Sequence, residues 1–151
     1  MLVDQTVSYL EMTSADQLLP GKVPTGEITL DRVDRGELDL IRSTIGRIGT
    51  PHHWSSLAWP EQQWLDVLAR PSVRSWIARV GIDVIGMVQM ETHHRGDVEI
   101  WDLGAVNRVW LHTSSFDHPH ALPNYCNRGF RPFRVEHRPR ELPTGPPQRC
   151  R

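Results

Sequence analysis

Residues 108–133 read RVWLHTSSFDHPHALPNYCNRGFRPF, and this stretch decides the fold. Its first six residues favour a β-strand, and a polar loop follows them. Pro119 predicts the start of a short helix that runs through Tyr125. Gly129 is typical of the residue just past a helix C-terminus. Residues 130–136 predict a last strand, so the stretch should form strand, loop, short helix and strand in succession.

Six further elements are predicted upstream from hydrophobic periodicity. Apolar residues at helical spacing indicate helices, and alternation of apolar and polar residues indicates strands. We expect strands over 27–33, 73–80, 84–91 and 98–101, and helices over 38–48 and 60–68. The two middle strands should form a hairpin, because only three residues separate them. This order predicts an α+β domain with a mixed, mostly antiparallel sheet and flanking helices.

One domain is expected in this chain. Its 151 residues, 38% of them hydrophobic, suffice for a single core. Residues 1–26 should be an N-terminal segment and linker, because Pro, Gly and Ser are frequent between 13 and 25. The domain proper is expected over 27–137. Residues 138–151 hold four prolines and no apolar period, which predicts a disordered tail.

The composition argues against several partners. Lysine and arginine number 17 against 18 aspartate and glutamate, so no strong field favours nucleic acid or an acidic membrane. No apolar run is long enough to span a bilayer, and no signal peptide is recognisable at the N-terminus. The two cysteines lack metal-ligand spacing, and the histidines show no metal-binding pattern. These features predict a cytoplasmic protein without a metal.

The stretch 108–133 closely resembles the last motif of the GNAT N-acetyltransferases. In that motif a strand and loop precede a helix with Ala and Tyr four residues apart, and Gly-Phe leads into the final strand. Ala121, Tyr125, Gly129 and Phe130 stand at those positions. The predicted order of elements over about 27–136 is also similar to that of the family. The resemblance implies transfer of an acetyl group from acetyl-CoA to an amine, either of a small molecule or of an amino terminus.

One part of the family's pattern is missing. In the family, the strand that matches 98–101 leads into a loop, Gln/Arg-x-x-Gly-x-Gly/Ala, and a long helix that together hold the cofactor pyrophosphate. None of the eleven glycines here is followed two positions later by Gly or Ala. Only residues 102–107 separate the strands predicted at 98–101 and 108–113, whereas a parallel crossover needs about a dozen residues. We therefore expect a GNAT-like sheet that lacks the central crossover helix.

This deletion has two predicted consequences. The strands on either side of it should pair more easily in antiparallel fashion through a short turn. One face of the sheet should also lose its cover, with Val109 or Trp110 exposed according to register. We expect lower stability and a tendency to associate.

The resemblance implies roles for residues close to the acetyl donor. Tyr125 would protonate the departing CoA thiolate; alternatively, it closes the core with its hydroxyl at the surface. Glu99 would act as base, and otherwise it is an exposed strand carboxylate. The backbone of Val98 and Ile100 would present amides to the acetyl group, and His118 is expected beside the cofactor.

The acceptor side is predicted in the loop between the first two helices, which lines the acceptor pocket in the family. His52, His53 and Trp54 lie in this loop. The histidines could shape a pocket or relay a proton, and otherwise they are loop residues beside core tryptophans.

Two functions from different classes remain open at the level of sequence. The first is an acetyl-CoA-dependent N-acetyltransferase with a primary amine as acceptor. The second is a non-catalytic, degenerate GNAT fragment that does not bind the cofactor. A third arrangement, in which Arg95 or Arg108 holds the cofactor phosphates in place of the missing loop, would preserve the enzyme.

Overall fold

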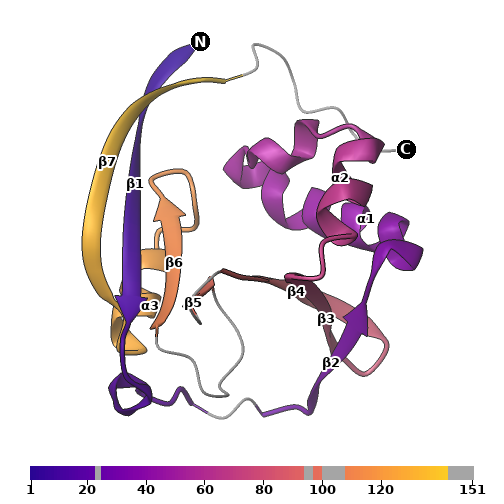
Figure 1. Ribbon diagram of the computed structural model, residues 1–151, viewed down its shortest axis with the longest axis horizontal. Helices are drawn as coiled ribbons and strands as arrows, with labels where there is room; N and C mark the ends of the chain where they lie inside the picture. The colour runs from indigo at the N-terminus through magenta and orange to yellow at the C-terminus, as the bar shows by residue number, and fades with distance from the viewer. Residues whose placement is uncertain (23–24, 94–96, 100–107, 143–151) are drawn as a thin grey trace.

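The computed structural model describes residues 1–22, 25–93, 97–99 and 108–142, which form a mixed α+β fold (Figure 1). The strands are β1 (Leu2–Met12), β2 (Ile28–Val33), β3 (Val73–Val80), β4 (Asp83–Thr92), β5 (Asp97–Glu99), β6 (Arg108–Ser114) and β7 (Arg131–Glu141). The α-helices are α1 (Leu38–Gly49), α2 (Glu61–Leu68) and α3 (Ala121–Asn127), and four short 3-10 turns lie between elements. The predicted α+β class and the mostly antiparallel sheet are therefore confirmed.

All seven strands belong to one sheet, in the order β2-β3-β4-β5-β6-β1-β7. Every neighbouring pair is antiparallel except β5 and β6, which run parallel with Asp97 opposite Arg108. The predicted antiparallel arrangement of these two strands is wrong. Because the pair covers only three residues, the chain has to return over only about 10 Å, and residues 100–107 can span that distance.

β1 lies in the interior of this sheet, between β6 and β7 (Figure 1). It pairs with β6 from Val7 to Met12 and with β7 from Leu2 to Glu11. Leu10 at its centre is fully buried. Residues 1–12 are therefore part of the folded domain, and the predicted domain start at residue 27 is corrected.

The C-terminal boundary changes as well, because β7 continues to Glu141. Residues 138–141 therefore belong to a strand and not to the predicted disordered tail. β7 is the last strand of the sheet, so one of its edges pairs with β1 and the other edge is not paired with a described strand. Arginine and proline are well suited to such an edge, where they discourage pairing with other chains, and this composition resembles that of a tail.

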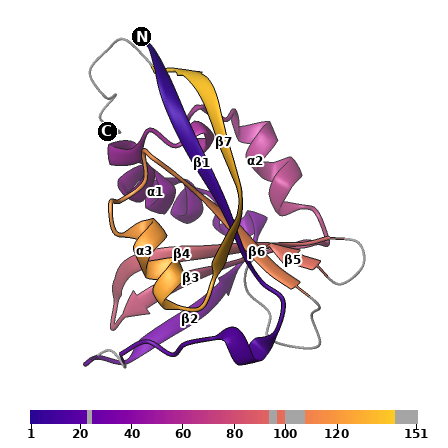
Figure 2. The same cartoon turned by 90° about the vertical axis from the view of Figure 1, so that its left-hand side faces the viewer.

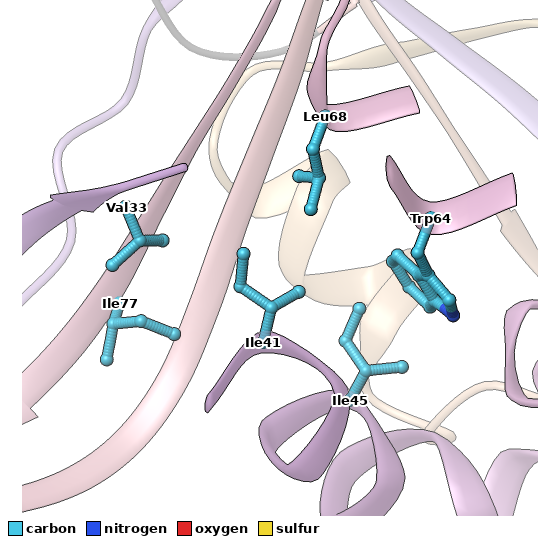
Figure 3. Packing of buried hydrophobic residues seen from close by; sticks show 6 residues of the cluster. All are labelled: Val33, Ile41, Ile45, Trp64, Leu68 and Ile77. Carbon is cyan, nitrogen blue, oxygen red and sulfur yellow. The ribbon is translucent and has the colours of Figure 1, made fainter. Parts of the chain in front are cut away.

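α1 and α2 cover the half of the sheet made by β2, β3 and β4 (Figures 1 and 2). The core between these layers consists of six buried side chains (Figure 3), Val33, Ile41, Ile45, Trp64, Leu68 and Ile77. The two members on each helix are four residues apart, so each helix presents one apolar face to the sheet. A capping box starts the 3-10 turn Arg35–Glu37, which leads directly into α1, since Asp34 accepts from the Gly36 amide and Glu37 accepts from the Asp34 amide.

α3 ends against the segment that follows β1. Gly129, just past the helix, has a φ of 99°, a conformation that favours glycine. A Cβ at this position would lie 1.7 Å from the carbonyl oxygen of Gln17. The Leu19 amide donates to the Arg128 carbonyl at 3.0 Å, so the two segments are joined by their backbones. The glycine of the Gly-Phe pair is thus required by both its dihedral angle and its neighbour.

Candidate functional site

A groove of about 790 Å³ lies where the turns after α1 meet the sheet half formed by β1, β6 and β7. α3 closes one part of its wall. Its lining includes His52, Trp54, Asp117, His118, Tyr125, Arg138 and Arg140. The groove therefore brings together histidines, arginines and the hydrogen-bonding aromatic residues Trp54 and Tyr125 from segments far apart in the sequence.

Asp117 is the residue that joins the turn after β6 to the loop after α1. One carboxylate oxygen accepts from the Trp54 indole N–H at 3.0 Å. The other accepts from the Thr113 hydroxyl and the Ser114 amide, both at 2.8 Å. With both oxygens engaged by the protein, Asp117 serves to hold the groove together.

Trp54 reaches Asp117 because α1 ends in a glycine. A Cβ on Gly49 would lie 2.9 Å from the Trp54 ring, so the ring can pack against the helix end only in its absence. The Trp54 amide also donates to the Gly49 carbonyl at 3.2 Å. The predicted pocket residue Trp54 thus lines the groove and is held from both sides.

His52 enters the groove with a defined tautomer. Its Nδ1 lies 2.8 Å from the carbonyl oxygen of Phe116. A carbonyl oxygen can only accept, so Nδ1 carries the hydrogen and Nε2 of the neutral ring is left as an acceptor. A histidine fixed in this way can take up a proton at Nε2.

His118 lies beside His52, with the two ring centroids 6.4 Å apart. Its Nδ1 accepts from the His120 amide at 3.2 Å. In the neutral ring the hydrogen then sits on Nε2, so His118 is a donor where His52 is an acceptor. The structure brings His118, predicted near the cofactor, into the same groove as the predicted acceptor residue His52.

Tyr125 lines the groove from α3. Burial, and secondly the negative charge of Asp117, raise the pKa of its phenol above the ordinary value of 10.0. The phenol therefore keeps its proton throughout the neutral range and is available there as a hydrogen-bond or proton donor.

His53 is the predicted pocket residue that the groove lining leaves out. It has a φ of 51°, and its ring meets the Phe116 ring edge-on with the centroids 6.4 Å apart. Its backbone nevertheless contributes to the site, because its carbonyl oxygen accepts from the Arg140 guanidinium. The neighbouring histidines thus have different surroundings.

Val98, the predicted donor-side residue of β5 whose side chain is described, does not line this groove. Val98 is buried, opposite Thr92 of β4 on one side and Val109 of β6 on the other. β5 therefore has a neighbour along both edges wherever it is described, and no edge is open there to a cofactor arm. The Glu99 side chain and all of Ile100, the remaining residues predicted on this strand, lie outside the described part.

Arg108 is committed to contacts between strands. Its Nε donates to the Glu11 carboxylate at 2.6 Å, and its Nη1 lies 3.7 Å from that of Asp97. The guanidinium also lies 4.7 Å from the centre of the Phe133 ring. These contacts tie β1, β5 and β7 to β6, and they engage the charge that was predicted to hold phosphates. Arg95, the other predicted phosphate ligand, lies outside the described residues.

Sequence reasoning missed three charged groove residues, Asp117, Arg138 and Arg140. A signal existed for Asp117, since a Ser and an Asp three residues apart after a strand are typical of a side-chain-bonded turn. The two arginines are two residues apart, so they share one face of any strand that contains them. The prediction ended the last strand before both arginines, whereas β7 continues to Glu141 and carries both of them into the groove.

Among the described residues, no three His, Cys, Asp or Glu side chains are grouped so that they could hold a metal ion. Over the same residues, none of the helices has the length and apolar character needed to cross a bilayer.

The fold is similar to that of a functionally unknown conserved protein from Staphylococcus epidermidis ATCC 12228, with a TM-score of 0.57. The two sequences are 9% identical, so the likeness concerns the fold alone. The match covers 90% of this chain but 61% of that protein, so the chain spans about three fifths of its structural relative. No protein-family model matches the chain, and no curated protein matches it in sequence.

Proposed function

We propose that this protein is an N-acetyltransferase that moves the acetyl group of acetyl-CoA to a primary amine held in the groove. The observation that carries the proposal is the presence of His52, with Nε2 as acceptor, and Tyr125, with its proton retained, in the wall of one groove. Acetyl transfer needs these two functions, a base for the amine and an acid for the leaving thiolate.

The proposed reaction uses each group once. The amine nitrogen attacks the thioester carbonyl, and its proton passes to His52 Nε2. The new C–N bond forms, the C–S bond breaks, and the Tyr125 hydroxyl gives its proton to the thiolate. Exchange with solvent then removes the proton from His52 and returns one to Tyr125. His118, as a donor beside His52, would bond the thioester carbonyl oxygen and stabilise the negative charge that develops there. Glu99 remains a second predicted base.

Calorimetric titration of the full chain with acetyl-CoA tests the proposal. We expect binding in the micromolar range, and release of free CoA thiol when amines are added. The Tyr125→Phe variant should bind acetyl-CoA like the unmodified chain but release thiol about 10²-fold or more slowly. Absence of binding at millimolar acetyl-CoA would contradict the proposal.

A second function is favoured by the missing phosphate loop. None of the eleven glycines has the family's loop spacing, and only residues 100–107 connect β5 to β6. A binding module derived from an acetyltransferase could keep the groove without the cofactor. In that case acetyl-CoA would produce no heat on titration, whereas small amines would still bind and would lose affinity in the Tyr125→Phe variant.

A further inference from the structure

One positive charge in the groove lining has no charged partner among the described residues. Its charged lining residues are Asp117, Arg138 and Arg140. Asp117 already accepts three hydrogen bonds, from Trp54 in the loop after α1 and from Thr113 and Ser114 of β6. The groove therefore offers a ligand more positive than negative charge.

Of the two groove arginines, Arg140 is the one whose charge has no anionic partner among the described residues. It donates to the His53 carbonyl, and its guanidinium lies 5.3 Å from the centre of the Phe116 ring. Both partners are neutral. Arg138 differs, because it donates to the Glu136 carboxylate at 2.6 Å and to the Tyr9 hydroxyl at 2.7 Å. Arg140 has further N–H donors, in a planar fork that matches a carboxylate.

Arg140 and His52 are held by the same short segment. The Phe116 carbonyl fixes the His52 ring, while the Phe116 ring lies beside the Arg140 guanidinium. Arg140 also bonds the carbonyl of His53, the residue next to His52. A proton acceptor and an unpaired guanidinium are thus positioned together, which suits a ligand whose amine and carboxylate are close in the same small molecule.

We infer that the acceptor is an amino acid, bound with its carboxylate on Arg140 and its amine beside His52. Acetylation of that amine rests on the proposed function, but recognition of the carboxylate does not. Arg138, two residues away on the same strand face, adds positive charge, and Trp54 and Val7 offer apolar surface to the side chain.

Binding by the full chain without acetyl-CoA tests the inference. The probes are the twenty amino acids, each compared by calorimetry with the amine that lacks only its carboxylate. We expect at least one amino acid to bind about 10- to 100-fold more tightly than its matched amine. The Arg140→Gln variant should reduce this ratio to about one, and Arg140→Lys should restore part of it.

The ratio separates recognition from structure, since a groove merely loosened by the loss of Arg140 would bind both compounds less tightly. Arg131→Gln, an exposed position on the same strand outside the groove lining, is the matched control and should leave the ratio unchanged. The inference is overturned if no amino acid binds at millimolar concentration, if the amines bind equally well, or if Arg140→Gln keeps the preference. Acetyl-CoA titration is a separate measurement, so failure of the proposed function and failure of this inference are distinguishable.

Discussion

Gly129 is the described glycine at which an added side chain would meet the closest contact. Its φ of 99° and the 1.7 Å approach of the Gln17 carbonyl to a virtual Cβ both exclude a side chain. We expect Gly129→Ala to lower the free energy of unfolding by about 2 kcal/mol or more, measured by denaturant unfolding.

Gly46→Ala is the matched control for this substitution. Gly46 lies in α1 and no atom approaches its virtual Cβ within 4 Å. Alanine there should raise stability by about 0.5–1 kcal/mol, because glycine is a poor helix former. Equal effects at the two positions would contradict this account of Gly129.

The raised pKa of Tyr125 predicts how stability depends on alkaline pH. Its folded pKa lies above 10.0, the value expected once the chain unfolds. The stabilisation of the protonated phenol is therefore fully present below pH 10.0 and is lost as the pH rises through the folded pKa. Unfolding followed from neutral to alkaline pH should show this loss in the unmodified chain and less of it in Tyr125→Phe. Identical pH profiles would refute it.

Asp117 contributes to that pKa through its charge. The Asp117→Asn substitution removes the charge but keeps an oxygen that can accept hydrogen bonds. We expect the pKa of Tyr125 to fall only part of the way towards 10.0, because burial is the larger cause and remains. Titration of tyrosinate by ultraviolet absorbance, with Tyr125→Phe as the blank, measures the change. A rise in the pKa would contradict the assignment.

At the scale of elements, β1 is the part that the sequence pattern assigned wrongly. If residues 1–26 were a linker, Leu10 would be exposed to solvent. In the structure it lies in the sheet and is fully buried. We expect Leu10→Ala to cost about 2–5 kcal/mol in denaturant unfolding. Leu2→Ala on the same strand, where the side chain is 71% exposed, should change stability by less than about 0.5 kcal/mol. If Leu10→Ala left the free energy of unfolding unchanged, the assignment of β1 to the buried sheet would be contradicted.

The elements that were predicted well are those with local signals. α1 repeats apolar residues at helical spacing, and the β3–β4 hairpin has its turn between two alternating runs. The partners of β1 have no such signal, since Glu11 pairs with an arginine 97 residues away and Tyr9 with a glutamate 127 residues away. Pairing across such distances is decided by the whole sheet. The parallel β5–β6 contact was missed for a different reason, because a pair of only three residues needs a much shorter return than a full crossover.

The candidate site was predictable for residues that lie in the motif over 108–133 or in the loop after α1. Tyr125, His52 and Trp54 were all named from the sequence and all line the groove. Arg140 was not, because its place depends on β7 being a strand, and the strand's edge composition hides it.

At the scale of the whole molecule, the absence of the crossover helix led us to expect exposed apolar surface on β6, whereas strongly exposed apolar side chains lie on β2. Val109 and Trp110 are only partly exposed. Leu30 and Ile28 on β2 are 58% and 43% exposed, on the face opposite to Val33 and the helices. Uncovered apolar surface of this kind favours association.

We therefore expect the chain to associate with increasing concentration in sedimentation velocity experiments. The double substitution Ile28→Thr and Leu30→Thr keeps strand-forming residues and should shift the species towards monomer. Thr29→Val on the other face of β2 is the control and should not reduce association. A monomer at every concentration, with a sharp cooperative melt, would contradict the prediction.

The interior position of β1 also sets the order of events during synthesis. β1 leaves the ribosome before every other described strand. Its side-chain hydrogen bonds to the neighbouring strands, Arg108 with Glu11 and Tyr9 with Glu136, join residues that are 97 and 127 positions apart. At about 5–20 residues per second, the strand waits about 5–20 s or longer for a partner. Throughout that time its apolar side chains are open to chaperones and to other nascent chains, so we expect the yield of folded protein to depend on translation speed.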